Sequence, residues 1–289
     1  MTPLYITWNP DPEMFNVGGF AVRWYGLLFA AGFFFGYLII QKFFKRQNIP
    51  LKVLDRLTIY MLIGTVIGAR LGHCLFYEPG YYIENPWQIF NLRQGGLASH
   101  GATIGILLSL WIFSRREKRT YSWIVDQIVI VVALSGFFIR TGNLINSEII
   151  GSPTALPWGF LFEQAPVTLS NLGEIPSHLL PLLKQYGNVP RHPAQIYEAL
   201  VCLLVFVLLF WLYWKKNAES KPFFLTGLFM VLIFGFRFFI EFYKDVQVDF
   251  ERTLSLDMGQ WLSIPVVITG LCLIIYSVKK KKTSNSKEL

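Results

Sequence analysis

Residues 122–140 read SWIVDQIVIVVALSGFFIR, and this stretch points directly to the fold class. Apart from Asp126 it carries no charge until its last residue, Arg140. An α-helix rises about 1.5 Å per residue, so a helix of this length nearly crosses the roughly 30 Å hydrocarbon core of a bilayer. The stretch therefore predicts a helix that spans a membrane.

Six further segments have a similar length and apolar character, and the composition of the chain agrees with them. Of its 289 residues, 53% are hydrophobic and only 15% are charged, whereas soluble domains have about 25% charged residues. This balance excludes a soluble enzyme, a disordered chain and a typical nucleic-acid binder. We predict an all-α, polytopic integral membrane protein that forms a single domain, 1–289, with seven transmembrane helices. Their expected ranges are 20–42, 53–77, 97–114, 122–140, 194–214, 223–243 and 258–278.

Basic residues indicate how these helices are oriented. Most of the 26 Lys and Arg residues lie in or beside alternate connections, at 42–56, 115–119, 215–221 and 279–287. Because cytoplasmic loops carry an excess of Lys and Arg, we expect these connections and the C-terminus in the cytoplasm. The N-terminus and the segment 141–193 then lie outside. This segment holds seven of the 15 prolines, so we expect an extracytoplasmic loop or cap rather than a continuous helix.

Glycines four residues apart occur in three of the predicted spans. Small residues at this spacing form a face along which two helices approach closely. We therefore predict that these positions lie at helix–helix contacts. They are Gly32 and Gly36, Gly64, Gly68 and Gly72, and Gly101 and Gly105.

Several polar groups are expected in the outer half of the bilayer, namely Arg70, Arg140 and Arg237 together with His100 and Tyr25. A charge at the centre of a spanning helix costs at least about 3 kcal/mol, so each one needs an explanation. Each arginine could reach the outer headgroups separately or pair with a carboxylate. Because several such groups lie at one depth on different helices, we favour an anion site at the outer leaflet. The planar guanidinium group binds phosphate oxygens with two hydrogen bonds and stays protonated.

Glu241 follows Arg237 by four residues and therefore shares its helix face. Such an ion pair can serve only to make the arginine tolerable in lipid. It can also hold one edge of the guanidinium group while the other edge meets a ligand. The two interpretations are compatible.

The run RTGNLINSE, residues 140–148, follows the span quoted above. Its Gly and Asn residues favour a non-helical backbone in which side chains bond nearby amides. Taken alone, such a run is a helix cap and a turn. Its position at the outer end of a helix that carries Arg140 makes it a second candidate part of the site.

His100 lies near the start of the third predicted span, in SHGATIG, residues 99–105. A lone histidine is more often a hydrogen-bonded structural residue, but its ordinary pKa of about 6.5 also suits a general base. The sequence has no metal-binding motif and no phosphate-binding glycine loop, so we expect neither a metal nor another cofactor. The basic C-terminal tail is explained by membrane orientation rather than by nucleic acid.

Six motifs occur in order between the first and sixth predicted spans. They are RWYGL at 23–27, GARLGHCLFY at 68–77, GGLASHGATIG at 95–105, RTGNLINSEIIG at 140–151, HPAQIYEAL at 192–200 and GFRFFIEFYK at 235–244. Together they cover most of the chain and resemble the signature of the bacterial prolipoprotein diacylglyceryl transferases.

The resemblance implies an enzyme of the bacterial plasma (inner) membrane with its active site facing the outer leaflet. It would transfer the diacylglyceryl group of phosphatidylglycerol to the lipobox cysteine of a preprolipoprotein, with a thioether formed and glycerol phosphate released. The resemblance further implies that Arg140 binds the lipid phosphate, that Arg237 is a second essential arginine and that His100 is the candidate base. The other residues expected to shape the substrate site are Tyr25, Asn143, Asn146, Glu148 and Glu241.

Two alternatives belong to other classes of protein. A non-enzymatic carrier or flippase for an anionic phospholipid would explain the arginines, but not the His100 segment or the order of the motifs. A purely structural membrane subunit would leave the charges within the membrane unexplained.

Overall fold

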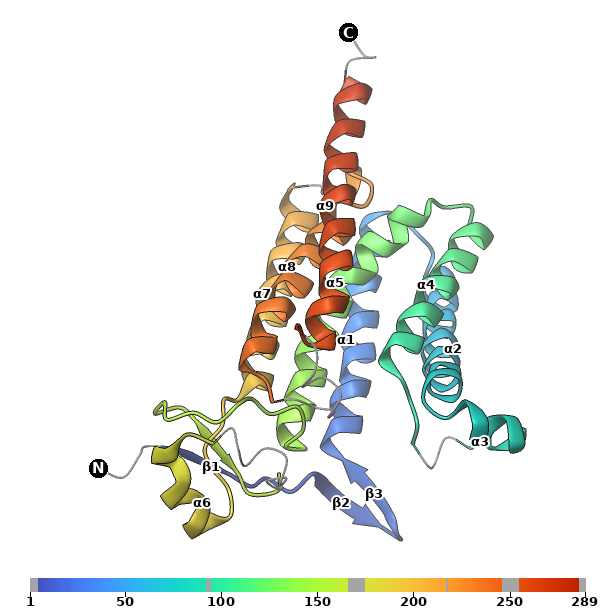
Figure 1. Ribbon diagram of the computed structural model, residues 1–289. Coiled ribbons are helices and arrows are strands. Elements are labelled where there is room, and N and C mark those ends of the chain that lie inside the picture. The colour runs from blue at the N-terminus through green and yellow to red at the C-terminus, as the bar shows by residue number, and fades with distance from the viewer. Residues whose placement is uncertain (1–4, 92–94, 166–174, 217, 246–254, 286–289) are drawn as a thin grey trace. The chain divides into compact units, whose positions relative to one another are not determined.

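The computed structural model describes residues 5–91, 95–165, 175–216, 218–245 and 255–285, and these are mostly helical (Figure 1). In this part of the chain, six helices are long and apolar enough to cross a membrane. They are α1 (Trp24–Arg46), α2 (Leu51–Phe76), α5 (Tyr121–Ile145), α7 (Ala194–Lys216), α8 (Phe224–Ile240) and α9 (Met258–Asn285).

The third predicted span forms a helix, α4 (Ser99–Arg116), but it is not among these six. Its polar residues at both ends, Ser99 and His100 at one and Arg115 and Arg116 at the other, lower its mean hydropathy. The prediction of a helix at this place is thus confirmed. The count of seven transmembrane helices stays a prediction.

The remaining elements are short. They are α3 (Pro79–Glu84), α6 (Leu180–Tyr186), the 3-10 helices η1 (Pro86–Phe90), η4 (Ser177–Leu179), η5 (Ala218–Ser220) and η6 (Glu241–Tyr243), and the strands β1 (Ile6–Trp8), β2 (Glu13–Val17), β3 (Phe20–Arg23) and β4 (Phe160–Phe162). The prediction of an all-α fold missed the strands. Because β3 occupies the start of the first predicted span, α1 begins only at Trp24.

Contacts divide the chain into two compact parts. The first part comprises Met1–Gly36 and Val129–Leu289, and the second comprises Tyr37–Ile128. Arg140 and Arg237 therefore belong to the first part, and His100 belongs to the second.

In the second part, α2 and α4 lie side by side along their glycines (Figure 1). A Cβ atom added to Gly64 would lie 2.7 Å from the carbonyl oxygen of Gly105. One added to Gly72 would lie 2.6 Å from the Cα of Gly101. Real Cβ atoms do not approach other atoms this closely, so these two helices can pack in this way only with glycine at the contact. The predicted small-residue contact is confirmed.

In the first part, α7, α8 and α9 lie side by side (Figure 1). The N-terminal half of α1 packs on α5, where Gly32 faces Ser135 and Gly36 faces Val131. A Cβ on Gly32 would lie 2.9 Å from the Ser135 hydroxyl oxygen. The close approach predicted for these two glycines is confirmed as well.

The segment 141–193 is not one continuous helix, as predicted. It contributes β4, which pairs in parallel with β1 from Ile6↔Phe160 to Trp8↔Phe162. Its small core contains Leu179, Leu182 and Val189. The separate antiparallel pair β2–β3 leads directly into α1 (Figure 1). These short elements fix the N-terminal residues against the segment that follows α5.

The start of the run 140–148 differs from its prediction, because α5 continues as a helix to Ile145. Gly142 allows this, since the helix passes so close to Tyr25 that a Cβ would lie 2.8 Å from a ring carbon of the tyrosine. The turn comes only afterwards, where Ser147 and Ile149 adopt left-handed backbone conformations with φ of 54° and 57°. Asn143 is therefore held on a helix rather than in a loop.

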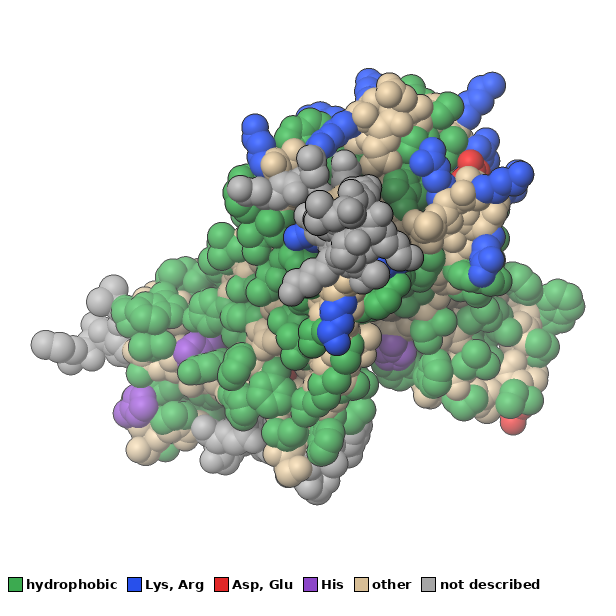
Figure 2. Space-filling model, turned by 90° about the horizontal axis from the view of Figure 1, so that it is seen from above, with side chains coloured by type: hydrophobic (Ala, Val, Ile, Leu, Met, Phe, Trp, Pro, Cys, Tyr) green, Lys and Arg blue, Asp and Glu red, His purple; other side chains and the backbone are tan. Residues whose placement is uncertain are grey.

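The surface has the character expected of a membrane protein. Many large apolar side chains on the long helices are exposed, including Phe34, Ile63 and Leu204. Figure 2 shows the face seen from above, where hydrophobic side chains are abundant and the visible charges are mostly Lys and Arg. Apolar surface on this scale is favourable against lipid.

Candidate active site

Arg140 lies in α5 with its side chain largely buried, 18% exposed. Its Nε atom lies 3.2 Å from Oε2 of Glu198, a residue of α7 that is only 7% exposed. Its two terminal nitrogens, Nη1 and Nη2, have no hydrogen-bond partner among the residues that the structure describes. The guanidinium group is thus held by one edge, and its fork of two nitrogens is available to a ligand.

Arg237 of α8 repeats this arrangement. Its Nε lies 3.4 Å from Oε1 of Glu241, so the ion pair predicted from the four-residue spacing is confirmed. Its terminal nitrogens also have no hydrogen-bond partner within the described ranges, and the side chain is 37% exposed. Gly259 at the start of α9 leaves room for the carboxylate, since a Cβ there would collide with Oε1 of Glu241.

Lys244 joins the two pairs. Its Nζ lies 3.0 Å from Oε1 of Glu198 and 3.4 Å from Oε1 of Glu241, and its side chain is only 4% exposed. A continuous chain of ion pairs therefore connects Arg140 of α5 to Arg237 of α8. The two arginines that the sequence singled out are brought into one cluster, which we call the arginine cluster: Arg140, Glu198, Lys244, Glu241 and Arg237.

Backbone contacts fix the position of Lys244. Its amide donates to the carbonyl of Glu241 at 3.1 Å, and it forms an antiparallel bridge with Gly151. The neighbouring amide of Ser152 donates to the carbonyl of Tyr243 at 2.9 Å. The end of α8 is thereby attached to the segment that follows α5.

Two members of this cluster, Glu198 and Lys244, are absent from the candidates that the sequence suggested. Lys244 sits just past a predicted span and resembles an ordinary flanking lysine. Glu198 offered a signal, because a carboxylate within a predicted span is costly unless it is paired. Its cationic partners come from segments that are distant in the chain, so spacing alone could not identify them.

Asn143, Asn146 and Glu148 form a second network. The amide nitrogens of Asn143 and Asn146 donate to the two carboxylate oxygens of Glu148, each at 3.2 Å. The amide nitrogen of Gln195 in α7 donates to the backbone carbonyl of Glu148 at 2.6 Å. These three candidate residues are therefore brought together, and Tyr25 packs beside them on Gly142 of the same helix.

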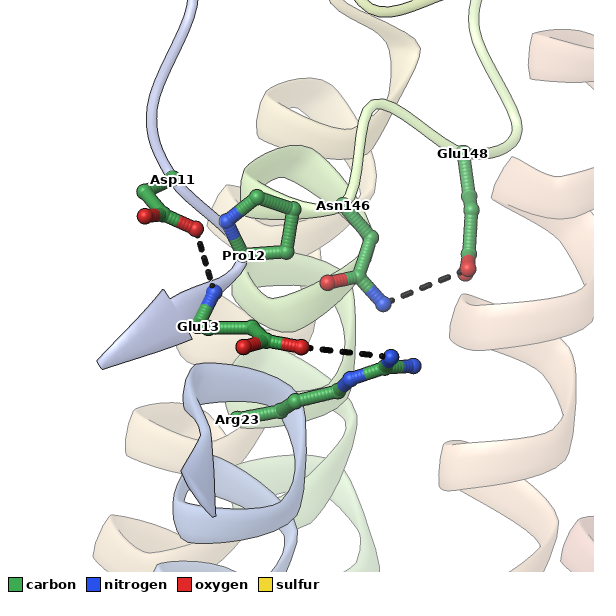
Figure 3. Close-up of a pocket in the computed structure, with 6 residues that line it drawn as sticks. All are labelled: Asp11, Pro12, Glu13, Arg23, Asn146 and Glu148. Atoms are coloured by element: carbon green, nitrogen blue, oxygen red, sulfur yellow. Dashed lines mark hydrogen bonds and ion pairs between the residues drawn. The ribbon is translucent and has the colours of Figure 1, made fainter. Parts of the chain in front are cut away.

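A cavity of about 390 Å³ opens next to this network (Figure 3). Its lining combines the end of the α5 segment with the N-terminal strands, and comprises Asp11, Pro12, Glu13, Arg23, Asn146 and Glu148. Arg23 pairs with Glu13 across the β2–β3 pair at 3.5 Å. Figure 3 shows Asn146 and Glu148 bonded to one another on one side of this space. Such a lining is polar enough to hydrogen-bond hydroxyl groups.

His100 lies in the second part of the chain, exposed on the first turn of α4. Its ring stacks on Tyr77, with ring centres 5.6 Å apart, and meets Phe76 edge-on at 6.0 Å. Its side chain makes no hydrogen bond within the described residues. Both interpretations of His100, as a general base and as a structural residue, therefore stay predictions.

Arg70 does not belong to an anion site, contrary to the sequence-based interpretation. It is almost fully buried, and its nitrogens donate to five backbone carbonyls in the segment 88–96, at 2.5 to 3.2 Å. Its guanidinium group also lies over the ring of Tyr82 at 5.1 Å. All of its donor groups are engaged, so Arg70 organises the connection between α2 and α4.

His192 is also structural. It is half-buried before α7, with Nδ1 3.3 Å from the hydroxyl of Tyr197 and its ring edge-on to Tyr243. Burial lowers the pKa of His192 below its usual value of about 6.5. The imidazole is therefore neutral at neutral pH.

Comparison with known proteins identifies the family. The sequence model of prolipoprotein diacylglyceryl transferases matches residues 12–276. The chain belongs to this family. As a member with six apolar helices in its described part, it is a multi-pass membrane protein.

Relatives named phosphatidylglycerol–prolipoprotein diacylglyceryl transferase match over nearly their whole length. One from Porphyromonas gingivalis is 43% identical over 288 residues, covering 97% of this chain and 98% of the relative. One from Tolumonas auensis is 42% identical over 275 residues, covering 95% and 98%. One from Bacteroides fragilis is 41% identical over 290 residues, covering 96% and 97%.

Proposed function

We propose that this protein transfers the diacylglyceryl group of phosphatidylglycerol to the thiol of a lipobox cysteine in a preprolipoprotein. Glycerol phosphate is the leaving group, and the product is a thioether. Family membership and the names of the relatives support this activity. The substrates are thus an anionic lipid and a signal peptide, and neither nucleic acid nor a cofactor takes part.

The observation that carries the assignment of the site is the way in which both arginines are held. Each makes its closest ion-pair contact with a buried glutamate through Nε, and its two terminal nitrogens have no hydrogen-bond partner in the described residues. A phosphodiester oxygen pair fits such a fork with two charge-assisted hydrogen bonds. We therefore assign the lipid phosphate to Arg140 and Arg237.

The reaction is a substitution at a glycerol carbon. The cysteine sulfur attacks that carbon as a thiolate, a carbon–sulfur bond forms, and the bond between the carbon and the phosphate oxygen breaks. The electron pair leaves with glycerol phosphate, whose negative charge increases in the transition state. Arginines aligned with that charge stabilise the transition state more than the bound lipid, which is how they would accelerate the step.

The thiol proton needs an acceptor, because an ordinary cysteine with a pKa of about 8.5 is mostly protonated at neutral pH. We assign this role to His100, whose exposed ring makes no hydrogen bond in the described part of the chain. The glycerol headgroup is assigned to the polar network of Asn143, Asn146 and Glu148, with Tyr25 beside it. Glu241 positions Arg237.

The same proposal includes a topology. The chain forms a single integral domain of the bacterial inner membrane, crosses it seven times and has its N-terminus outside and its C-terminus in the cytoplasm. The segment 141–193 is the extracytoplasmic cap, and the site faces the outer leaflet. The distribution of basic loops supports this orientation.

A product assay tests the function. The purified protein is incubated with phosphatidylglycerol and a lipobox peptide, and the peptide is analysed by mass spectrometry. We expect the mass of one diacylglyceryl group on the cysteine, and no gain with a folded Arg140→Gln variant. Unmodified peptide combined with transport of labelled lipid between leaflets would support a carrier or flippase instead.

A further inference from the structure

The reaction leaves Lys244 unexplained, although it is among the most buried cations in the structure. Its side chain is 4% exposed, and its ammonium group lies between carboxylates that belong to α7 and η6. Burying a lysine costs several kcal/mol unless its charge is compensated. Glu198 and Glu241 provide that compensation, but each of them also binds one of the two arginines.

The charges of the arginine cluster do not cancel. Arg140, Arg237 and Lys244 contribute three positive charges, and Glu198 and Glu241 contribute two negative charges. The connected cluster therefore carries one positive charge. Without Lys244 it would be neutral, and each arginine would face only the carboxylate that holds it.

A phosphodiester carries one negative charge, which matches the surplus charge of the cluster. Two neutral arginine–glutamate pairs would offer hydrogen-bond donors but little net attraction for an anion. In a partly desolvated site, a charge several ångströms away still contributes strongly to binding. The surplus charge comes from Lys244, which contacts the same two carboxylates that pair with the arginines.

We infer that Lys244 is a positioning residue that gives the arginine cluster its net charge of one for binding a monoanionic phosphodiester. It holds Glu198 and Glu241 together, so that each carboxylate engages Nε of its arginine and leaves the terminal nitrogens to the lipid. This inference rests on the proposed function, because it assumes that the lipid phosphate binds at Arg140 and Arg237. It adds a residue that makes no contact with the lipid itself.

Three variants separate charge from structure. Lys244→Met removes the charge and keeps much of the length, and the cluster becomes neutral. Lys244→Met combined with Glu198→Gln restores a net charge of one without the ammonium group. Lys184→Met, on the exposed face of α6, removes a lysine that has no part in the cluster and is the matched control.

Two measurements are made on each purified, folded variant. The first is kcat and KM for phosphatidylglycerol with a lipobox peptide. The second is the rise in thermal unfolding temperature on adding phosphatidylglycerol, with diacylglycerol, which lacks the phosphate, as the comparison lipid. The second measurement reports lipid binding without any turnover.

We expect Lys244→Met to lower kcat/KM by about 10- to 100-fold, mainly through KM, as is typical for residues that orient a ligand-binding side chain. Its stabilisation by phosphatidylglycerol should decrease, whereas Lys184→Met should behave as the wild type. The double variant should recover part of the loss, because its net charge is restored although Arg140 loses the carboxylate with which it pairs. If Lys244→Met does not fold, Lys244→Arg, which keeps the positive charge, tests the inference instead. We expect its kcat/KM to lie within about threefold of the wild-type value.

Normal lipid binding in Lys244→Met, no recovery in the double variant, or a tenfold loss in folded Lys244→Arg would each overturn the inference. Failure of the proposed site is recognised separately through Arg140→Gln. If Arg140→Gln transfers lipid normally, the phosphate does not bind at this cluster. If Arg140→Gln is inactive while Lys244→Met is normal, only the role of Lys244 is wrong.

Discussion

At the scale of single residues, arginine and lysine are not equivalent at position 140. Arg140 uses Nε for Glu198 and offers two further nitrogens to a phosphate, whereas a lysine has one nitrogen for both partners. Loss of one charge-assisted hydrogen bond, worth about 1.5–3 kcal/mol, corresponds to roughly 10- to 100-fold. We expect Arg140→Lys to lower kcat/KM by this factor in the peptide assay while the protein still folds. A folded Arg140→Lys enzyme with normal kcat/KM would contradict the proposal that both terminal nitrogens of Arg140 bind the phosphate.

His100 should affect the rate rather than lipid binding. A general base contributes about 10²- to 10⁴-fold, so His100→Gln should lower kcat by a factor in that range. Raising the pH toward the thiol pKa of about 8.5 should restore part of the loss, because more cysteine ionises without help. Stabilisation by phosphatidylglycerol should not change. Unchanged turnover in folded His100→Gln would show that another group removes the thiol proton.

His192 should make the folded protein sensitive to acid. Burial lowers the pKa of His192 in the folded protein. As the pH falls through about 6.5, the imidazole therefore binds a proton in the unfolded chain but stays neutral in the folded one. This contribution to stability is present above pH 6.5 and is lost as the pH falls through the lowered pKa. The unfolding temperature of the wild type should therefore fall more between pH 7.5 and 5 than that of His192→Gln. Parallel curves for the two proteins would contradict this assignment.

The sequence predicted most of the charged residues of the candidate site, but not all of the side chains with which they form ion pairs. The pair Arg237–Glu241 follows from a four-residue spacing on one helix. The contacts of Arg140 and of Lys244 with Glu198 join segments that are distant in the chain, and a single sequence contains no information on which faces meet. Arg70 was misassigned for the same reason, since its carbonyl partners lie in an irregular segment.

At the scale of elements, the glycine contact between α2 and α4 should determine whether the second part folds. A Cβ at position 101 would lie 2.6 Å from the Cα of Gly72, with no flexible side chain to move aside. Overpacking of this kind costs about 1–3 kcal/mol or more. We expect Gly101→Ala to lower the unfolding temperature in detergent clearly. Gly80→Ala, where nothing lies within 4 Å, is the matched control and should not change it.

Gly101→Ala with the stability of the control would mean that α2 and α4 can separate without loss. The glycine spacing itself could be read from the sequence, because a four-residue repeat of small residues has one physical use in a long apolar helix. The strands could not be predicted in this way. β1 and β4 have three residues each and pair through backbone groups across more than 150 positions, so neither has a recognisable alternation.

At the scale of the whole molecule, the orientation in the membrane is open to direct measurement. Single cysteines are introduced as Lys45→Cys, near a basic connection, and as Lys184→Cys, in the proposed cap. The background lacks the native Cys74, Cys202 and Cys272. In intact cells, an impermeant thiol reagent added outside should label the cysteine at position 184 but not the one at position 45. The cysteine at position 45 should react only after the cells are permeabilised. Labelling at position 45 from outside would reverse the proposed topology.

Most of the long helices could be predicted from hydropathy, because a long apolar segment in a chain of this composition is typical of a membrane-spanning helix. The helix ends shifted where a local feature intervened, as at α5, which Gly142 allows to continue to Ile145. α4 shows the limit of the method, since a helix with polar ends forms at the expected place without meeting the hydropathy of its neighbours.

The parallel pairing of β1 with β4 has a consequence for biogenesis. Residues Ile6–Trp8 precede the first membrane helix, but their partners, Phe160–Phe162, follow α5. During synthesis the N-terminal strand therefore stays without this partner until Phe160–Phe162 have been made, after α1, α2, α4 and α5. This small sheet can therefore form only after the segment that leads to Glu198 has begun to emerge, which makes its pairing a late step of folding.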